Sequence, residues 1–327
     1  MLRHRTRLRG PFLRTPSPAA LVQAFYDPFS SMFVPLVDGL ARHRLIVRGT
    51  TQREARVHGV TLNYYQRLLW GPPPDDDAPH PRNMPILLVH GIGDSALTWA
   101  LVMRRLARGH DVYALDLLGH GLSGLPAGHS YASLEEHVEA VTGFVQEVIG
   151  RPALLVGNSL GGMLAVRAAW KAPGWVRGLA LLNPGGAPLQ GRASYDEFFT
   201  KISDPRLTTA FRVGGEMFGA VPRLMLVPIL RSLQHMFQRP VILEAYGASD
   251  DSVFLCPDHL RCLPVPAALI WGQRDHFLPE GSFPFWDENL PDAPRLLLER
   301  CGHLPQRERP LSVVRFLREF AMHLDNI

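Results

Sequence analysis

A serine flanked by glycines is the first feature of this sequence that could do chemistry. Gly157, Ser159 and Gly161 form a G-x-S-x-G pattern that follows the apolar run 153–156 and precedes a helix-like stretch, 162–171. In this context the pattern is typical of a sharp strand-to-helix turn that exposes a serine hydroxyl beside a base. A backbone N–H at such a turn can also meet a developing oxyanion. We therefore predict that Ser159 is a nucleophile; the alternative is an incidental serine in a glycine-rich turn.

An acid and a histidine follow the serine in the order Ser, acid, His. Asp275 comes shortly after the strand-like run 266–272, and His303 comes after a second such run, 295–300. Residues just after parallel strands gather at one edge of a sheet. We predict that His303 accepts the proton of Ser159 and that Asp275 orients the imidazole and stabilises its charged form.

The acid is assigned by its place along the chain. Asn183, which is not a carboxylate, follows the strand predicted at 176–182. The remaining place for the acid is after the next strand, where Asp275 lies.

The second oxyanion donor is expected from the loop after an earlier strand. The apolar run 85–89 is followed by a glycine-containing loop and then by a helical stretch, 95–107. We predict that the backbone N–H groups of Ile92 and Leu160 form the oxyanion hole. His90 is expected to orient this loop through a backbone hydrogen bond, and a role as the base is the alternative.

Five motifs follow one another along the chain, at residues 88–93, 116–123, 157–162, 271–275 and 301–306. Together they resemble the α/β-hydrolase superfamily, from about Val57 to the C-terminus. The resemblance implies an α/β fold with a mostly parallel eight-stranded sheet and helices on both faces. It also implies that a set of residues shapes the turn after the fourth strand: Asp116, Gly119, His120, Gly121 and Ser123.

We divide the chain into an N-terminal extension, 1–50, a hydrolase core, 51–184 with 262–327, and a helical cap or lid, 185–261. The connection after the strand predicted at 176–182, at about eighty residues, is far longer than an ordinary one. Its large apolar side chains, such as Phe198 and Met217, should mostly form the core of the cap. The remainder would face the cleft and suit an acyl chain or an aromatic group.

One helix beside the sheet can be predicted in detail. Ser133 and Glu136 have the spacing of a capping box, which predicts a helix that begins after Ser133. Apolar residues recur at helical spacing and form one face: Leu134, Val138, Val141, Val145 and Val148.

Composition agrees with one large α/β domain. The 327 residues are 46% hydrophobic and carry a net charge of +4, almost wholly from arginine. This charge does not indicate a nucleic-acid partner. Cys256, Cys262 and Cys301 include no C-x-x-C spacing, so they carry neither a zinc nor a redox signature. We predict a hydrolase without a metal or a cofactor. Cys301 is interpreted as a small residue at a strand end rather than a second nucleophile, and the acidic run 75–77 as a solvated loop.

The N-terminus contains five arginines before its first acid, Asp27, but lacks the apolar core of a signal peptide. No run reaches the roughly 18 apolar residues of a membrane span. We therefore expect a cytoplasmic protein whose N-terminal segment packs on its own surface. Contact of this segment with an anionic membrane surface is the alternative.

The predicted set of Ser159, Asp275 and His303 favours a serine hydrolase that acts through an acyl-enzyme. Its substrates would be small-molecule carboxylic esters with an apolar acyl or aromatic group. The first alternative is a carbon–carbon bond hydrolase of the meta-cleavage-product type, which residues 181–186 resemble. Those enzymes usually carry tryptophan after the histidine, where Leu304 stands here. The second alternative is a non-catalytic accessory or binding protein on the same fold.

Overall fold

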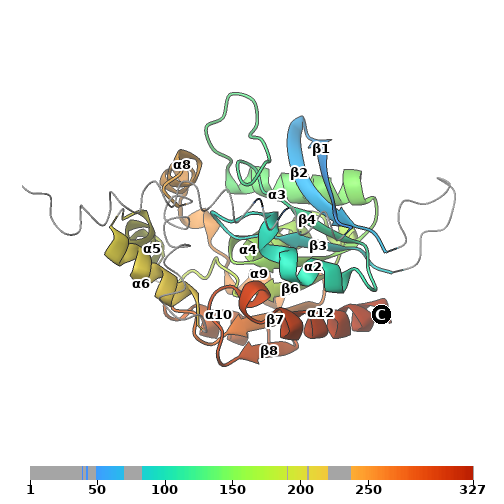
Figure 1. Ribbon diagram of the computed structural model, residues 1–327. Coiled ribbons are helices and arrows are strands. Elements are labelled where there is room, and N and C mark those ends of the chain that lie inside the picture. The colour runs from blue at the N-terminus through green and yellow to red at the C-terminus, as the bar shows by residue number, and fades with distance from the viewer. Residues whose placement is uncertain are drawn as a thin grey trace, which may run out of the picture.

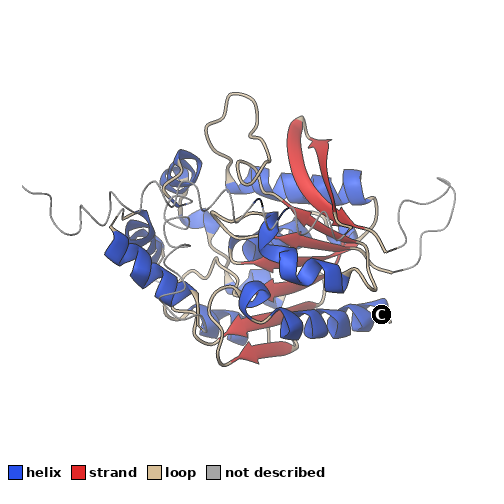
Figure 2. Ribbon diagram, viewed as in Figure 1, coloured by secondary structure: helices blue, strands red, loops and turns tan. Residues whose placement is uncertain are grey.

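The computed structural model describes residues 49–69, 83–189, 191–204, 206–219 and 237–326, together with the isolated residues 39 and 42. Eight strands form a sheet in the order β1-β2-β4-β3-β5-β6-β7-β8, with helices packed around it (Figure 2). The strands are β1 (Thr51–Val57), β2 (Val60–Arg67), β3 (Ile86–Val89), β4 (Val112–Leu115), β5 (Ala153–Asn158), β6 (Val176–Leu182), β7 (Ala267–Gly272) and β8 (Arg295–Leu298).

The sheet is mostly parallel, as predicted. Strand β2 pairs antiparallel with β1 and β4, and every other neighbouring pair is parallel. The strands β3, β4 and β5 are buried along their whole length. Continuous burial is what a parallel sheet covered on both faces requires, and it explains why these strands are visible as apolar runs in the sequence.

Helices cover both faces of the sheet (Figure 1). On one face α3 (Leu134–Gly143) and α4 (Leu160–Lys171) pack against the sheet in one buried cluster. On the other face α2 (Ala100–Leu106) and α12 (Pro310–Asp325) form a second cluster. Two further helices, α10 (Ser282–Asn289) and α11 (Pro305–Glu308), flank β8 in the sequence.

Helix α3 begins as predicted. The Ser133 hydroxyl accepts from the backbone N–H of Glu136, and the Glu136 carboxylate accepts from the backbone N–H of Ser133. The predicted apolar face is buried at Val138, Val141 and Val145. The helix continues as a short π-helix over Phe144–Ile149.

Between β6 and β7 the described chain forms α5 (Arg192–Ser203), α6 (Leu207–Met217), α8 (Pro240–Ala248) and α9 (Pro257–Arg261). A hydrophobic cluster joins Phe198 of α5 and Met217 of α6 to Phe277 and Leu304, which follow β7 and β8. Helices in this connection therefore pack directly on loops at the carboxyl ends of the strands. The division into core and cap stays a prediction.

Several predictions fall on residues outside the described ones: the acidic run 75–77, most of the extension 1–50, and 220–236 of the connection.

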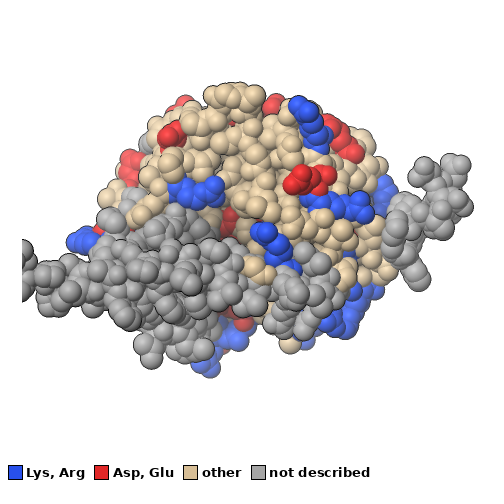
Figure 3. Space-filling model, turned by 45° about the horizontal axis from the view of Figure 1, so that its top comes forward, with Lys and Arg blue, Asp and Glu red and all other residues tan. Residues whose placement is uncertain are grey.

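None of the helices that the structure describes combines the length and apolar character needed to cross a membrane. On the face seen in Figure 3, basic and acidic side chains are interspersed.

The turn between β5 and α4 is compressed against its neighbours. A Cβ on Gly157 would lie 2.2 Å from the carbonyl oxygen of Gly161, and one on Gly161 would lie 2.3 Å from that of Val89. Both obstacles are backbone atoms, which cannot rotate away as a side chain could. Glycine is therefore required at both positions, as the spacing of the motif predicts.

Gly161→Ala should lower the free energy of unfolding by about 3 kcal/mol, because the turn and strand β3 must separate to admit the methyl group. Urea unfolding followed by circular dichroism measures this change. Gly174→Ala is the matched control, since a Cβ at Gly174 meets nothing within 4 Å. Equal midpoints for the two variants would contradict the prediction.

Stability should also depend on pH through His137. Burial lowers the pKa of this side chain from 6.5 to about 4. Because the folded pKa lies below the ordinary value, the unfolded chain binds more protons between these values, and the free energy of unfolding falls as pH is lowered through this window. When the pH is lowered from about 7 to about 5, protonation linked to His137 should lower the free energy of unfolding by about 2 kcal/mol.

Urea unfolding of His137→Gln at both pH values tests this contribution. The loss of stability on acidification should be smaller in this variant than in the wild type, whereas His276→Gln, at an exposed position, should retain the wild-type pH dependence. Identical pH dependence in His137→Gln and the wild type would show that His137 does not carry the effect.

Candidate active site

Ser159 lies in the turn between β5 and α4, so the predicted strand-turn-helix context is present. Its backbone is in an unusual conformation for a residue with a side chain, with φ 55° and ψ −120°. Hydrogen bonds hold the turn there: the N–H of Ser159 donates to Leu182 O at 3.1 Å, and its carbonyl accepts from the N–H of Gly185 at 3.0 Å. The serine is thus held between β6 and the loop that follows it.

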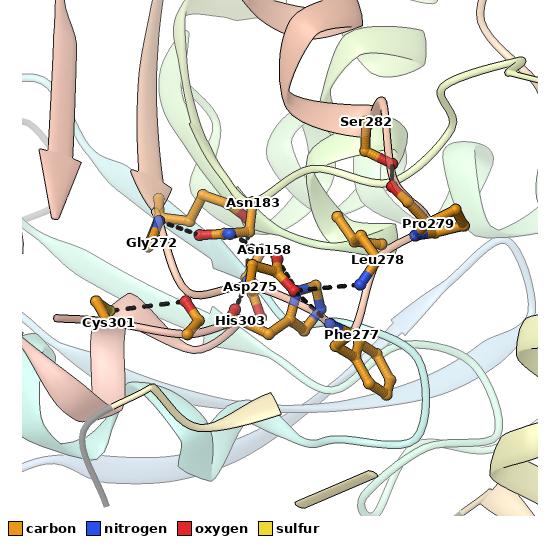
Figure 4. A network of polar contacts seen from close by, with 12 residues as sticks. Asn158, Asn183, Gly272, Asp275, Phe277, Leu278, Pro279, Ser282, Cys301 and His303 are labelled. Carbon is orange, nitrogen blue, oxygen red and sulfur yellow. Dashed lines mark hydrogen bonds and ion pairs between the residues drawn. The ribbon is translucent and has the colours of Figure 1, made fainter. Parts of the chain in front are cut away.

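Asp275 and His303 meet in the structure as the sequence predicts (Figure 4). The Nδ1 of His303 donates to Oδ2 of Asp275 at 2.7 Å. The other carboxylate oxygen, Oδ1, accepts from the backbone N–H groups of Phe277 and Leu278, at 2.9 and 3.1 Å. The Asp275 side chain is 0% exposed. A buried carboxylate with this set of donors can orient an imidazole and balance its positive charge.

Asn183, predicted only as a position without a carboxylate, is a further partner of Asp275. Its Nδ2 donates to Asp275 Oδ2 at 2.6 Å, and its Oδ1 accepts from the N–H of Gly272 at 3.0 Å. The residue has φ 40°, a conformation that asparagine tolerates better than most side chains. The uncharged amide of Asn183, which follows β6, therefore helps to hold the carboxylate of Asp275, which follows β7, in place.

Asn158 and Gln306 connect the serine turn to the histidine loop. The Nδ2 of Asn158 donates to His303 O at 3.0 Å, and its Oδ1 accepts from Nε2 of Gln306 at 3.0 Å. Gln306 also contacts Thr98 Oγ1 at 3.2 Å. The residue directly before Ser159 thus fixes the backbone of the histidine. Asn158 belongs to the predicted motif at 157–162, but its contact with the histidine loop was not predicted.

The loop after β3 approaches the serine closely. A Cβ on Gly91 would lie 2.9 Å from Cβ of Ser159. His90 Nδ1 donates to Gly91 O at 2.7 Å, and its Nε2 accepts from the N–H of Leu117 at 3.0 Å. Both ring nitrogens of His90 are therefore engaged with backbone, as expected for a residue that orients the loop.

Ile92 and Leu160, the predicted oxyanion donors, line the same cavity as Ser159. Neither backbone N–H donates a hydrogen bond to another residue in the described part of the chain. Leu160 is the first residue of α4, where N–H groups have no partner within the helix. Both groups could therefore donate to a bound oxygen.

The turn after β4 is built around Asp116. Its Oδ1 accepts from the N–H of Ala96 at 2.7 Å, and its Oδ2 accepts from Nδ2 of Asn63 at 2.7 Å. Ser123 Oγ donates to the carbonyl of Asp116 at 2.7 Å. These bonds join three segments, in keeping with the structural role that the resemblance implies.

A cavity of about 420 Å³ contains the candidate site. Its lining includes the backbone-strained Ser159 together with large apolar side chains: Met163, Phe198, Phe199, Val241, Ile242 and Leu278. His120 and His137 also line it, which sequence analysis did not foresee. A second cavity, of about 660 Å³, lies beside α12 and includes none of the predicted site residues.

Cys301 is not a second nucleophile in this arrangement. Burial raises the pKa of its thiol to about 12, so the reactive thiolate is not formed near neutral pH. Within the residues that the structure describes, no three or more His, Cys, Asp and Glu side chains gather so as to hold a metal ion.

Comparisons with known proteins identify relatives of this chain. The chain is 25% identical to the monoacylglycerol lipase ABHD6 of Homo sapiens, over 74% of this chain and 76% of the relative. It is 27% identical to the 2-hydroxymuconate semialdehyde hydrolase of Pseudomonas sp. (strain CF600), over 74% of this chain and 88% of the relative.

A solved structure described as a membrane phospholipase A, a bacterial virulence factor, shares the fold with a TM-score of 0.72 at 24% identity, covering 94% of this chain and 97% of its own. A family model, described as the alpha/beta hydrolase family, matches residues 86–316. The chain therefore belongs to the alpha/beta hydrolase family.

Proposed function

We propose that this hydrolase cleaves carboxylic esters, with Ser159 as nucleophile, His303 as general base and acid, and Asp275 as the group that orients His303. The observation that carries the proposal is the hydrogen bond of 2.7 Å from His303 Nδ1 to the buried Asp275. This bond commits the Nδ1 proton to the carboxylate. It leaves Nε2 of a neutral imidazole unprotonated and able to take a proton from a serine hydroxyl.

In the acylation step, Ser159 Oγ attacks the carbonyl carbon of the ester while its proton passes to Nε2 of His303. The carbonyl π electrons move to the oxygen, which becomes an oxyanion that the N–H groups of Ile92 and Leu160 stabilise. When the oxyanion collapses, the bond to the alkoxy oxygen breaks and His303 delivers its proton to that oxygen. The products are an alcohol and an acyl-Ser159 ester.

Deacylation follows the same course with water as nucleophile. His303 takes one proton from the water as its oxygen attacks the acyl carbon, and returns this proton to Ser159 Oγ when the second oxyanion collapses. A carboxylic acid leaves and the serine is regenerated. The apolar walls of the cavity, including Phe198 and Leu278, suit an acyl chain or an aromatic group.

The relative from Pseudomonas named above makes carbon–carbon bond hydrolysis the second candidate. Both reactions would use the same three residues, so the substrate separates them. Turnover of a vinylogous diketone without turnover of simple esters would favour this second candidate. Turnover of neither would favour a non-catalytic protein.

Ser159→Ala should lower kcat for p-nitrophenyl esters by about 10⁴-fold or more, because the variant lacks the oxygen that is proposed to form the acyl-enzyme. Initial rates are measured on esters from acetate to palmitate, and the preferred chain length reports the depth of the cavity. Ser312→Ala, on α12 and outside the cavity, is the control and should keep the wild-type rate. A Ser159→Ala enzyme with near-normal rates would exclude the serine mechanism.

Asp275→Asn should lower kcat by about 10⁴-fold, because an amide that donates to His303 favours the wrong tautomer of the imidazole. The comparison uses the same esters, with KM measured separately. Asp287→Asn, which removes a carboxylate paired with Arg295 on the surface, should retain activity. Loss of activity in both variants, or in neither, would contradict the role of Asp275.

A further inference from the structure

The turn that carries Ile92 is held at its first end by a histidine. It runs from Gly91 to Asp94 and is closed by the N–H of Asp94, which donates to Gly91 O at 3.2 Å. Gly93, at the third position, has φ 72°, a conformation that few side chains tolerate. His90 Nδ1 donates to the same oxygen of Gly91 at 2.7 Å. The direction of the Ile92 N–H therefore depends on how both ends of this turn are held.

Arg307 holds the second end of the turn. Its Nη2 donates to Oδ1 of Asp94 at 2.7 Å, and this oxygen also accepts from the N–H of Ser95 at 2.8 Å. The side chain of Asp94 is 13% exposed and that of Arg307 is 37% exposed. A hydrogen bond between two charged groups is stronger when one of them is largely removed from water. Asp94 is thus fixed by a residue that lies 213 positions further along the chain.

The same guanidinium group also reaches the helix that follows the turn. Thr98 lies in η1 (Ala96–Trp99), and its Oγ1 accepts from Nε of Arg307 at 2.7 Å. Thr98 is buried. A guanidinium can bond to two acceptors at once because its donors are held in one rigid plane. Arg307 therefore bridges Asp94 and Thr98, which lie on either side of the start of η1.

Arg307 connects this turn to the histidine of the candidate site. Arg307 and Gln306 are neighbours in α11, which begins two residues after His303. Gln306 ties this segment to Asn158 in the serine turn, at 3.0 Å. Arg307 ties it to the turn that carries Ile92. The proposed general base therefore has one connection to the nucleophile and a separate one to an oxyanion donor.

We propose that Arg307 is a positioning residue, which keeps the N–H of Ile92 where the oxyanion forms when His303 takes the proton of Ser159. This inference rests on the proposed ester hydrolysis and names a further residue on which that reaction depends. Arg307 is not among the described residues that line the cavity beside Ser159, so it acts through the turn rather than on the substrate. A displaced oxyanion donor weakens the transition state, where the oxygen is charged, more than the bound ester.

Arg307→Met removes both hydrogen bonds and keeps a long side chain. The kcat for p-nitrophenyl butyrate should fall by about 30-fold, less than complete loss of an oxyanion donor costs, while KM changes by less than about threefold. Arg295→Met is the matched control, since Arg295 also pairs with an aspartate, Asp287, but away from the site. Its kcat should stay at the wild-type value. A wild-type kcat in Arg307→Met, or an equal fall in both variants, overturns the proposal.

A trifluoromethyl ketone tests whether the loss lies at the oxyanion. Ser159 Oγ adds to its carbonyl carbon, the proton passes to His303, and the carbonyl electrons move to the oxygen, as in the proposed acylation. The inhibition constant of 1,1,1-trifluoro-2-octanone should rise in Arg307→Met by about the factor by which kcat/KM falls. That of heptyl methyl ether, which forms no adduct, should not change. Equal rises for both compounds would show a general distortion of the cavity and overturn the positioning role.

Arg307→Lys keeps the positive charge but loses the fork of donors. One ammonium group cannot occupy the positions of both Nε and Nη2, so kcat should stay at least about fivefold below the wild-type value. Wild-type kcat in this variant would show that charge alone suffices, and would overturn the bridge.

The double variant of Arg307→Met with Asp94→Ala tests whether the two residues act through one contact. Its kcat should be no lower than that of the more impaired single variant, because the second change removes a partner that is already lost. Losses in kcat that multiply would show that Arg307 acts elsewhere and would overturn the proposal.

Hydrogen exchange separates the positioning role from the proposed reaction, because it needs no substrate. The N–H groups of Asp94 and Thr98, which close the turn and η1, should exchange about tenfold faster in Arg307→Met than in the wild type or in Arg295→Met. If the wild type hydrolyses no ester but exchange rises in this way, ester hydrolysis is wrong and Arg307 still holds the turn. If esters are hydrolysed and exchange is unchanged in Arg307→Met, the positioning role is wrong and the proposed function stands.

Discussion

The burial of one carboxylate, that of Asp275, is the constraint on which the candidate site depends. A charge removed from water is strongly unfavourable unless hydrogen-bond donors surround it. Here the donors are the side chains of Asn183 and His303 and the backbone N–H groups of Phe277 and Leu278. They come from the segments that follow β6, β7 and β8. Satisfying a single buried group therefore sets the relative positions of three loops at once.

The backbone of His303 is held as firmly as its ring. Its N–H donates to Met217 O at 2.7 Å, and its carbonyl accepts from the side chain of Asn158 at 3.0 Å. Met217 ends α6, and Asn158 ends β5 directly before Ser159. The histidine loop is thus tied to the serine turn on one side and to a helix of the β6–β7 connection on the other. A shift of α6 would displace the imidazole relative to the serine.

Local signals were sufficient for much of the fold. The strands β3, β5 and β7 appear as apolar runs because helices bury both faces of the sheet along them. The start of α3 could be predicted because a capping box joins residues only three positions apart. The start of α4 was less accurate than its end: the helix begins at Leu160, in the turn itself, rather than at Gly162. Residues 157–162 belong partly to the turn and partly to the helix, and the spacing of the motif does not show where the turn ends and the helix begins.

By itself the sequence determined the strand-turn-helix context of Ser159, the order of the acid and the histidine, and the glycines that this turn requires, because each depends on neighbouring residues or on chain order. Only the tertiary structure decided that Asn183 braces Asp275, a contact between residues 92 positions apart. It likewise decided that His120 and His137 share a cavity wall with Ser159. Side chains on separate elements come into contact through the packing of the whole sheet. Residue type and spacing along the chain do not predict such contacts.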